Sequence, residues 1–177
     1  MFLYVALAIV VLVGAVLAYA ATRPGRIHVH RGTNIKAPAE KIFPLINDFH
    51  RWVSWSPYET RDPAMKKTYS GAASGRGAVY EWNGNKQAGQ GRMEIIEVSE
   101  PAQITIKLDF LKPFEGHNVA EFALHPQADS TRVTWSMDGP SSYMTKLIGV
   151  FFNMDKMIGK DFETGLANLK TLTEKSG

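Results

Sequence analysis

Hydrophobic positions follow three different patterns along this chain, and the first is a continuous apolar run. Residues 1–22 contain no charged side chain, and the run FLYVALAIVVLVGAVLAYAA ends soon afterwards at Arg23-Pro24-Gly25-Arg26. A helix rises about 1.5 Å per residue, so this segment would reach about 30 Å, the thickness of the hydrocarbon core of a bilayer. The pattern predicts a transmembrane anchor helix over residues 1–22, a short linker over residues 23–26, and one domain over residues 27–174.

Two other interpretations of the first segment are weaker. Ala18-Tyr19-Ala20 resembles the small-x-small pattern of a cleaved secretory signal, but no basic residue precedes Phe2, as a signal peptide requires. A buried core helix of this length would show a polar face. Basic residues follow the run and none precedes it, so the positive-inside rule predicts a single-pass membrane protein with a cytoplasmic domain. The basic residues just after the run are Arg23, Arg26, Arg31, Lys36 and Lys41.

The second pattern, from residue 26 to residue 139, is one of short strands interrupted by a helical segment. Residues 26–35 alternate and predict a first strand. Pro38 opens a helix with an apolar face, which restarts at Asn47-Asp48 and stops at Ser56-Pro57. Short strands separated by Gly, Pro and Asn clusters then predict an antiparallel meander. These strands are residues 66–70, 78–83, 92–99, 104–110, 119–124 and 131–137.

The third pattern is a helical stripe at the end of the chain. Apolar residues recur at three- and four-residue steps over residues 144–172, which predicts one long helix that begins near Ser142. Gly149, Gly159 and Gly165 each lower helix propensity by about 1 kcal/mol relative to Ala, so a bend is possible. The order of elements predicts an α+β fold, in which a curved antiparallel sheet of about seven strands wraps around the C-terminal helix.

Charge and composition exclude several classes of function. The formal net charge is +3, and the Lys and Arg residues are scattered among acids, so no basic stripe for nucleic acid is present. The chain has no cysteine, which excludes disulfides, thiolate catalysis and Cys-ligated metals. The glycine-rich segment of residues 71–77 joins two strands and does not open a helix, so it lacks the geometry of a phosphate-binding loop.

Several stretches resemble the START/Bet v 1-like (SRPBCC) superfamily, and within it bacterial members of the polyketide cyclase/dehydrase type. These stretches are IKAPAEKIFPLINDFHRWVSWSPYE (residues 35–59), DPAMKKTYSG (62–71), GAVYEWNGN (77–85), GRMEI (91–95) and TRVTWSMDGP (131–140). The resemblance spans residues 27–172 and implies the helix-grip fold, whose sheet and long helix enclose an apolar cavity for lipids, sterols, polyketides or aromatic molecules. It indicates fold more strongly than reaction, because function depends on the site and not on the fold.

The alternation within the strands is compatible with such a cavity. Apolar side chains occupy one face of several strands, while charged side chains occupy the other. Regularly spaced aromatic residues and methionines more often form a solid core, so the resemblance is what favours a cavity. The residues expected to line the cavity or its mouth are Trp52, Trp55, Tyr58, Tyr80, Trp82, Leu108, Phe110, Trp135, Met137, Phe151, Met154 and Ile158.

The densest aromatic cluster is Trp52-Val-Ser-Trp55-Ser-Pro-Tyr58. It could form a lid at the mouth of the cavity, or it could plug the open end of the sheet, since both positions place indole rings at a boundary between dry and wet surroundings. The same cluster could instead rest on a membrane interface, where Trp and Tyr are favoured. The sequence leaves these three interpretations open.

Histidines give no clear metal or catalytic site. His28 and His30 share one face of the first strand, but no third ligand lies nearby in sequence, so solvated side chains are the favoured interpretation. His117 follows a Phe-Glu-Gly segment and is expected in a surface turn. We therefore expect no metal and no cofactor.

The acidic residues are equally poor catalytic candidates. A general acid or base has to point into the pocket. Glu81 and Asp109 fall on the strand faces opposite the aromatic residues, which leaves Asp138 at a strand end and Asp155 beside the apolar stripe. Asp155 is also explained by an ion pair with a basic side chain on the sheet. No catalytic residue is assigned.

The sequence thus predicts membrane-tethered binding of a lipid-like or aromatic, polyketide-like molecule in an internal cavity, with access controlled by residues 52–58. One alternative is an enzyme of the polyketide cyclase/dehydrase type, which inward-facing Asp155, Glu81 or His117 bonded to one another would favour. The other is a protein-interaction module with a solid core. The expected partners are a hydrophobic small molecule or lipid and the membrane, without nucleic acid, and the sequence identifies no protein partner.

Overall fold

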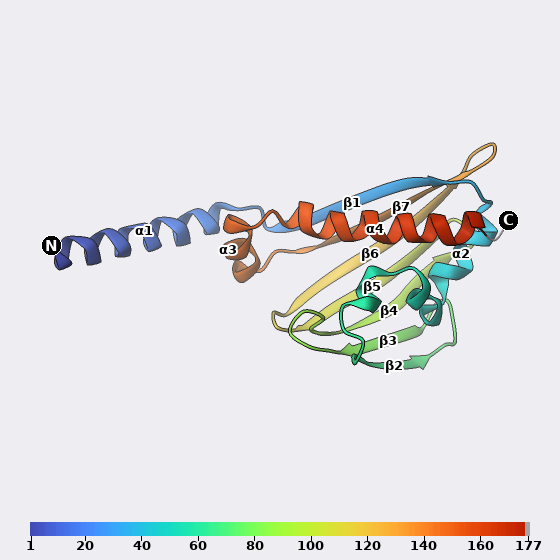
Figure 1. Cartoon of the computed structure of the whole chain (residues 1–177), viewed down its shortest axis with the longest axis horizontal. Coiled ribbons are helices and arrows are strands. Elements are labelled where there is room, and N and C mark those ends of the chain that lie inside the picture. The colour runs from blue at the N-terminus through green and yellow to red at the C-terminus, as the bar shows by residue number, and fades with distance from the viewer. Residues whose placement is uncertain (176–177) are drawn as a thin grey trace.

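The structure, a computed structural model, describes residues 1–175 of the chain. A long N-terminal helix projects from an α+β domain (Figure 1). Within the described residues the helices are α1 (Phe2–Thr22), α2 (Ala39–Asn47), the 3₁₀ turns η1 (Phe49–Ser54) and η2 (Pro57–Thr60), α3 (Tyr143–Phe151) and α4 (Met154–Lys175). The strands are β1 (Arg26–Ile35), β2 (Lys66–Gly71), β3 (Ala78–Asn83), β4 (Gln90–Ser99), β5 (Gln103–Lys112), β6 (Gly116–Pro126) and β7 (Thr131–Pro140).

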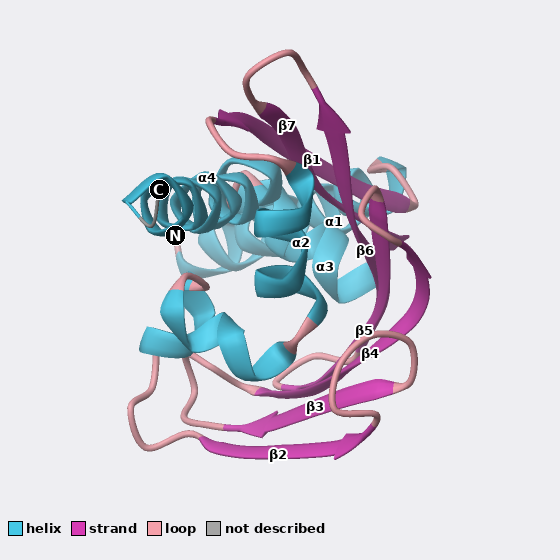
Figure 2. Ribbon diagram, turned by 90° about the vertical axis from the view of Figure 1, so that its right-hand side faces the viewer, coloured by secondary structure: helices cyan, strands magenta, loops and turns pink. Residues whose placement is uncertain are grey.

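The strands form one antiparallel sheet, which confirms the predicted fold class. Strands β2 to β7 follow one another as a meander, and β1 pairs with β7, so the order is β1-β7-β6-β5-β4-β3-β2. Figure 2 shows the sheet curving around α4, with β1 and β7 at one end of the curve and β2 at the other. Short turns join the meander strands, and the twist of the strands produces the curvature that creates a concave face.

Helix α4 lies against the sheet, and an arginine of β1 holds it there. Arg31 Nη2 lies 2.9 Å from Asp155 Oδ2, and Arg31 Nε lies 2.8 Å from Glu163 Oε1. Gly159 lies between these two acids, and a Cβ there would come 2.0 Å from Arg31 Nη2. The missing side chain therefore leaves room for the guanidinium to bind both carboxylates on one helix face. Asp155 pairs with an arginine on the sheet and does not face the interior.

The C-terminal segment is two helices rather than the one long helix expected from the apolar stripe. Ser142 caps α3, since its side chain accepts a hydrogen bond from the Thr145 backbone N–H. The helix stops at Phe151, and Asn153 Oδ1 accepts a hydrogen bond from the Lys156 N–H at 2.9 Å to start α4. The interruption thus depends on an asparagine cap, while the predicted bend sites at Gly159 and Gly165 lie inside α4.

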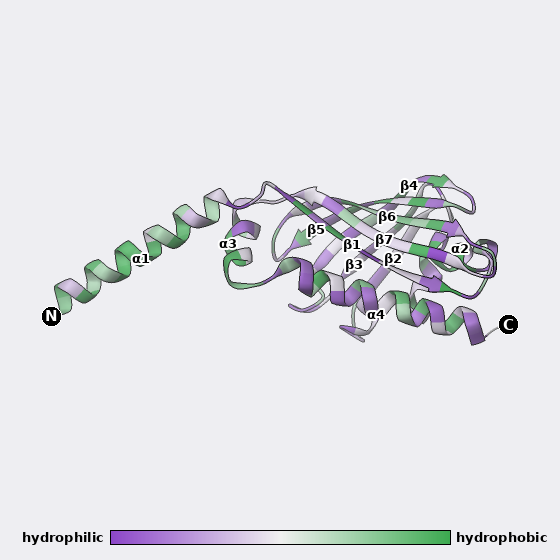
Figure 3. Cartoon of the chain, turned by 90° about the horizontal axis from the view of Figure 1, so that it is seen from above, coloured by the Kyte–Doolittle hydropathy of each residue, from purple (hydrophilic) through white to green (hydrophobic). Residues whose placement is uncertain are grey.

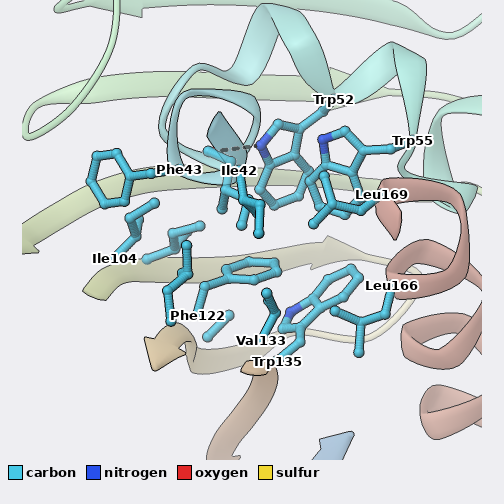
Figure 4. Close-up of a cluster of buried hydrophobic side chains, with 14 of the residues drawn as sticks. Ile42, Phe43, Trp52, Trp55, Ile104, Phe122, Val133, Trp135, Leu166 and Leu169 are labelled. Carbon is cyan, nitrogen blue, oxygen red and sulfur yellow. Dashed lines mark hydrogen bonds between the residues drawn. The ribbon is translucent and has the colours of Figure 1, made fainter. Parts of the chain in front are cut away.

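Aromatic side chains fill the core between α2, η1, the sheet and α4 (Figure 4). Trp135 stacks on Phe162 at 4.1 Å between ring centroids and on Phe122 at 4.8 Å. Trp52 and Trp55 are 4% and 2% exposed, and their indole N–H groups donate to backbone carbonyls of α2. These two tryptophans therefore plug the core, and they form neither a lid nor a surface that could rest on a membrane.

Helix α1 differs from every other helix in its surface. Figure 3 colours it mostly green with a few pale segments, whereas α4 alternates between polar and apolar residues. Among residues 1–175, α1 is the one helix that is long and apolar enough to cross a membrane. Its C-terminal end packs against α3, where the Tyr143 hydroxyl donates to the Leu17 carbonyl at 3.0 Å and Arg23 Nη2 donates to the Gly149 carbonyl at 3.2 Å.

Candidate ligand-binding cavity

A cavity of about 380 Å³ lies between the concave face of the sheet and the helices α3 and α4. This volume is in the range of about 300–1,000 Å³ that is typical of small-molecule sites. Cross-strand pairing places the lining side chains next to one another, since Met93 opposes both Tyr80 and Leu108, and Ala120 opposes Met137. Most of the wall is apolar, because the inward positions of β3 to β7 carry aromatic, aliphatic and methionine side chains.

Most of the residues expected at the cavity do line it. They are Trp52, Tyr58, Tyr80, Trp82, Leu108, Phe110, Trp135, Met137, Met154 and Ile158. Two do not. Trp55 is buried behind the cavity, with its N–H on the Leu45 carbonyl, and Phe151 is 68% exposed at the end of α3. Phe151 was expected inside because the apolar stripe was extended through the interruption between α3 and α4.

A strongly exposed part of the cavity wall, which we call its mouth, lies beside α3. Thr145 and Ile148 of α3 line the cavity there, together with Phe114 of the β5–β6 turn and Met157 of α4. Phe114 and Met157 are 48% and 54% exposed, so these side chains lie at the edge between the cavity and solvent. Figure 1 shows α3 at the end of the domain from which α1 projects, so the lining residues of α3 lie at that end.

An ion pair closes the side of the cavity between η2 and α4. Arg61 Nη2 lies 2.5 Å from Asp161 Oδ2, and the Arg61 guanidinium carbon lies 4.6 Å from the centre of the Tyr58 ring. Tyr58 thus lies beneath a bridge that joins two elements. Burial raises the pKa of the Tyr58 hydroxyl far above its ordinary value, with a smaller contribution from Asp161, so Tyr58 stays neutral at any physiological pH.

A buried carboxylate that the sequence analysis did not identify lies within the cavity wall. The Glu59 side chain is 3% exposed, accepts a hydrogen bond from the Tyr80 hydroxyl at 2.8 Å, and pairs with Lys67 Nζ. Burial, and then the charge of Glu59, raise the pKa of Tyr80 well above its ordinary value, so Tyr80 remains a hydrogen-bond donor. In the sequence, Glu59 directly follows Tyr58 in the aromatic segment. This segment has no regular period, so the sequence does not predict which way the Glu59 side chain points.

Two residues of the cavity wall each carry a polar atom that is buried within the protein without a partner. Ser56 Oγ and Trp135 Nε1 are buried without a hydrogen bond, and both residues line the cavity at 3% exposure each. Buried polar atoms are nearly always hydrogen-bonded, so each exception requires an explanation. Tyr80, Glu59 and Ser56 are polar residues of the wall near η2, and Asn118, Thr145 and Glu115 are polar residues elsewhere in the wall.

The histidines of the strands lie on the outer face of the sheet. His117 is part of β6 and not of a turn, because β6 begins at Gly116, and its Nδ1 lies 2.8 Å from Asp109 Oδ1 on the neighbouring strand. His28 pairs with Asp138 across β1 and β7 at 2.7 Å. Within residues 1–175, no group of three or more His, Asp or Glu side chains is arranged to hold a metal ion.

The acids that could have supported catalysis also lie away from the cavity. Asp155 is bound to Arg31, Asp109 to His117 and Lys107, and Glu81 is exposed. Asp155, Glu81 and His117 therefore do not form the inward-facing network that would favour an enzyme.

Solved structures share this architecture at low sequence identity. Protein MLL2253 from Mesorhizobium loti has a TM-score of 0.64 at 15% identity, covering 85% of this chain and 99% of that one. CV1439 from Chromobacterium violaceum has a TM-score of 0.58 at 15% identity, covering 85% and 99%. DynU16, from the dynemicin biosynthetic locus, has a TM-score of 0.60 at 15% identity, covering 84% of this chain and 48% of that one. Identities this low show a common fold alone.

A comparison with the sequence models of protein families identifies a family, which the structural neighbours do not. No curated protein matches the chain. The sequence model of the family described as "Polyketide cyclase / dehydrase and lipid transport" matches residues 26–174, which is the whole α+β domain from the start of β1 almost to the end of α4. With a match of this extent and a helix-grip sheet around α4, the chain belongs to the polyketide cyclase/dehydrase and lipid transport family of the START/Bet v 1-like superfamily.

Proposed function

We propose that this protein binds one apolar or amphipathic small molecule in its cavity while α1 tethers it to a membrane. The observation that carries the proposal is the mostly apolar cavity of about 380 Å³ that the sheet and α4 enclose. Each Å² of apolar ligand surface that is removed from water contributes about 25 cal/mol, so a ligand that fills the cavity gains its affinity mainly from burial. The name of the family, which includes lipid transport, is consistent with this function.

The position of the mouth supports a ligand drawn from the membrane. Leu17 lies five residues before the end of α1, so the Tyr143–Leu17 hydrogen bond lies about 7.5 Å inside that end. If α1 spans the bilayer, α3 therefore lies in the headgroup region, and the mouth beside α3 faces the lipid surface. A ligand could then pass between bilayer and cavity with little exposure to water.

Native mass spectrometry of the full chain, purified in lipid nanodiscs and analysed together with a lipid extract, tests this function. We expect an apolar molecule at about one per chain. Ala120→Phe places a large side chain in the cavity, because Ala120 lies on the concave face and is 4% exposed, and it should abolish co-purification. Val119→Phe is the matched control, since Val119 is the adjacent residue on the opposite face and is 42% exposed. An apo mass for both the wild type and Val119→Phe would contradict the proposal.

The two alternative functions have less support. A solid interaction module lacks a cavity, and this domain has one. An enzyme needs a catalytic group that points at the substrate, and the acids and histidine considered for that role lie on the outer surface or in ion pairs. Glu59 with Tyr80 is the one acid–hydroxyl pair found in the described cavity wall, and its placement fits recognition of a polar ligand group at least as well as proton transfer.

A further inference from the structure

We propose that the junction of α1, α3 and α4 binds an anionic phospholipid of the bilayer surface. The site is a groove of about 490 Å³ whose lining includes Arg23, Arg26, Lys146, Phe151 and Phe152, and which we call the junction groove. The cations hold the phosphate of the headgroup, and the two phenylalanines enter the acyl region beside it. The inference rests on the membrane tether of the proposed function but not on the ligand of the cavity.

Helix α3 is apolar, yet none of its residues is buried. Lys146 is the one charged residue among the nine of Tyr143–Phe151, and every residue of this helix is partly or fully exposed. Phe151 is 68% exposed, and Phe152, which directly follows it, is 56% exposed. A contiguous exposed apolar patch marks a surface that binds a membrane or another molecule. The connection between α3 and α4 is such a surface.

The contacts of α1 identify the bilayer as the partner of this surface. The Tyr143 hydroxyl at the start of α3 donates to the Leu17 carbonyl, and Arg23 Nη2 donates to the Gly149 carbonyl near its end. Helix α3 is thus fixed at two points to the last turns of α1 and lies between α1 and α4 (Figure 1). If α1 spans the bilayer, the exposed end of α3 lies where the headgroups meet the acyl chains.

The charges of the junction groove favour an anion. Within residues 1–175, no carboxylate forms an ion pair with Arg23, Arg26 or Lys146. Among the described lining residues, Asp155 is the only acid, and it already binds Arg31. Three cations therefore line the groove beside one acid that is already neutralised. Basic residues in this position attract the anionic lipids of the cytoplasmic leaflet.

The other groups of the groove also fit a lipid headgroup. Arginine and lysine are the usual partners of phosphate oxygens in proteins. Ser141 and Thr145 add hydroxyl groups to the lining, and His28, its remaining titratable residue, is paired with Asp138. Phe151 and Phe152 provide the apolar side that a free phosphate ion would not require. The combination of cations and exposed aromatic rings is therefore matched to a lipid.

Native mass spectrometry of the full chain from nanodiscs that contain equal amounts of phosphatidylcholine and phosphatidylglycerol tests this site. We expect the lipids that remain bound to be enriched roughly tenfold in phosphatidylglycerol, which corresponds to about 1.4 kcal/mol. Arg26→Gln combined with Lys146→Gln should bring the ratio close to one. Lys36→Gln combined with Arg132→Gln is the matched control, because it removes one lysine and one arginine at the opposite end of β1, where Ile35 pairs with Thr131.

A fluorescent probe measures whether the aromatic patch reaches the lipid. The chain has no cysteine, so Phe152→Cys can carry a single environment-sensitive fluorophore. Asp129→Cys, in the exposed turn between β6 and β7, is the control, since this turn lies at the end of the domain away from α1 (Figure 1). Lipids that are spin-labelled near the top of the acyl chain should quench the probe at position 152 and leave the probe at position 129 bright.

Each outcome decides the matter. Equal retention of the two lipids, or an unchanged ratio in the Arg26→Gln and Lys146→Gln double variant, would overturn the inference. Loss of the enrichment on addition of inorganic phosphate at constant ionic strength would also overturn it, because the groove would then bind a free ion. An unquenched probe at position 152 would mean that the patch meets solvent or another protein chain instead of lipid, and the inference would be wrong.

Failures of this inference and of the proposed function can be told apart. Ala120→Phe fills the cavity and should leave the ratio of bound phospholipids unchanged, so loss of the cavity ligand does not affect the junction groove. A chain that does not enter nanodiscs would overturn the tether and this inference together. A chain that enters nanodiscs without enrichment of phosphatidylglycerol would overturn this inference alone.

Discussion

The hydrogen bond between Tyr80 and Glu59 shows how one residue can stabilise a buried charge. Tyr80→Phe removes the hydroxyl donor, so Glu59 Oε1, one oxygen of a buried carboxylate, loses this hydrogen bond. Hydrogen bonds to charged groups contribute about 1.5–3 kcal/mol, so we expect the free energy of unfolding to fall by about that amount. Urea denaturation of the full chain in one detergent measures it.

Tyr69→Phe is the matched control for that substitution. Tyr69 opposes Tyr80 across β2 and β3, and its ring lies 5.1 Å from the Tyr80 ring, but no hydrogen bond joins it to Glu59. The control should cost clearly less than Tyr80→Phe. Equal losses would mean that removing either hydroxyl has the same effect, so the hydrogen bond to Glu59 would not account for it.

His117 and Asp109 form a pH-sensitive pair on the outer face of β5 and β6. The hydrogen bond to Asp109 is the main reason that the pKa of His117 is raised above its ordinary 6.5. Burial alone would raise the pKa of Asp109, but hydrogen bonds from His117 and Lys107 outweigh it and lower the pKa below 3.8. The stabilisation from His117 is therefore complete below pH 6.5 and is lost as the pH rises through its raised pKa.

Nuclear magnetic resonance titration of the His117 ring checks this pair. We expect Asp109→Asn to return the His117 pKa towards 6.5, and Glu115→Gln to lower it less, because Glu115 lies 3.4 Å from the ring and contributes least to the shift. A larger effect of Glu115→Gln would show that the turn, and not the strand pair, sets the pKa.

For single residues, the alternation of apolar and polar positions predicted the direction of a side chain well where a strand faces the core, and poorly elsewhere. Parity alone places Tyr80, Trp82, Leu108 and Phe110 on the concave face, because side chains alternate without exception along a regular strand. Ser56 and Glu59 belong to irregular turns, where no period links sequence position to direction. Their burial depends on contacts with distant strands, so the sequence alone gave no reason to select them.

Among the elements, α4 depends on glycine where it crosses the core. A Cβ at Gly165 would lie 2.9 Å from Trp135, so Gly165→Ala should cost about 1–3 kcal/mol through overpacking, despite a helix-propensity gain of about 1 kcal/mol. Gly149→Ala in α3 meets nothing within 4 Å and should not lower the midpoint. Thermal unfolding followed by circular dichroism compares the two. A Gly165→Ala variant as stable as Gly149→Ala would mean that the indole can move aside.

The sequence predicted the elements well and their interruptions poorly. All seven strands and the order of the helices follow from hydrophobic period and turn residues. The separation of α3 from α4 does not, because Asn153 is a weak signal inside an apolar stripe, and the cap became visible only through its bond to the Lys156 N–H. The interruption matters for function, since it turns α3 away from α4 and allows it to pack on α1 at the mouth.

For the whole molecule, the proposed function joins two features that the chain keeps at one end: the apolar helix and the mouth of the cavity. If α1 is a retained anchor, the intact mass of the protein purified from membranes should include residues 1–22. Cleavage after Ala20 would remove Leu17 and with it the hydrogen bond that joins Tyr143 of α3 to α1. A mass that lacks residues 1–22 would show that a signal peptide had been cleaved. The domain would then have no helix that holds the cavity mouth at the membrane.

The natural absence of cysteine makes the orientation directly measurable. Asp129→Cys introduces a single thiol in the exposed turn between β6 and β7, far along the chain from α1. With the basic residues of the α1–β1 connection on the cytoplasmic side, as the positive-inside rule predicts, a membrane-impermeant maleimide should label this thiol only after the cells are broken. Labelling in intact cells would place the domain, and the ligand it draws from the bilayer, on the other side of the membrane.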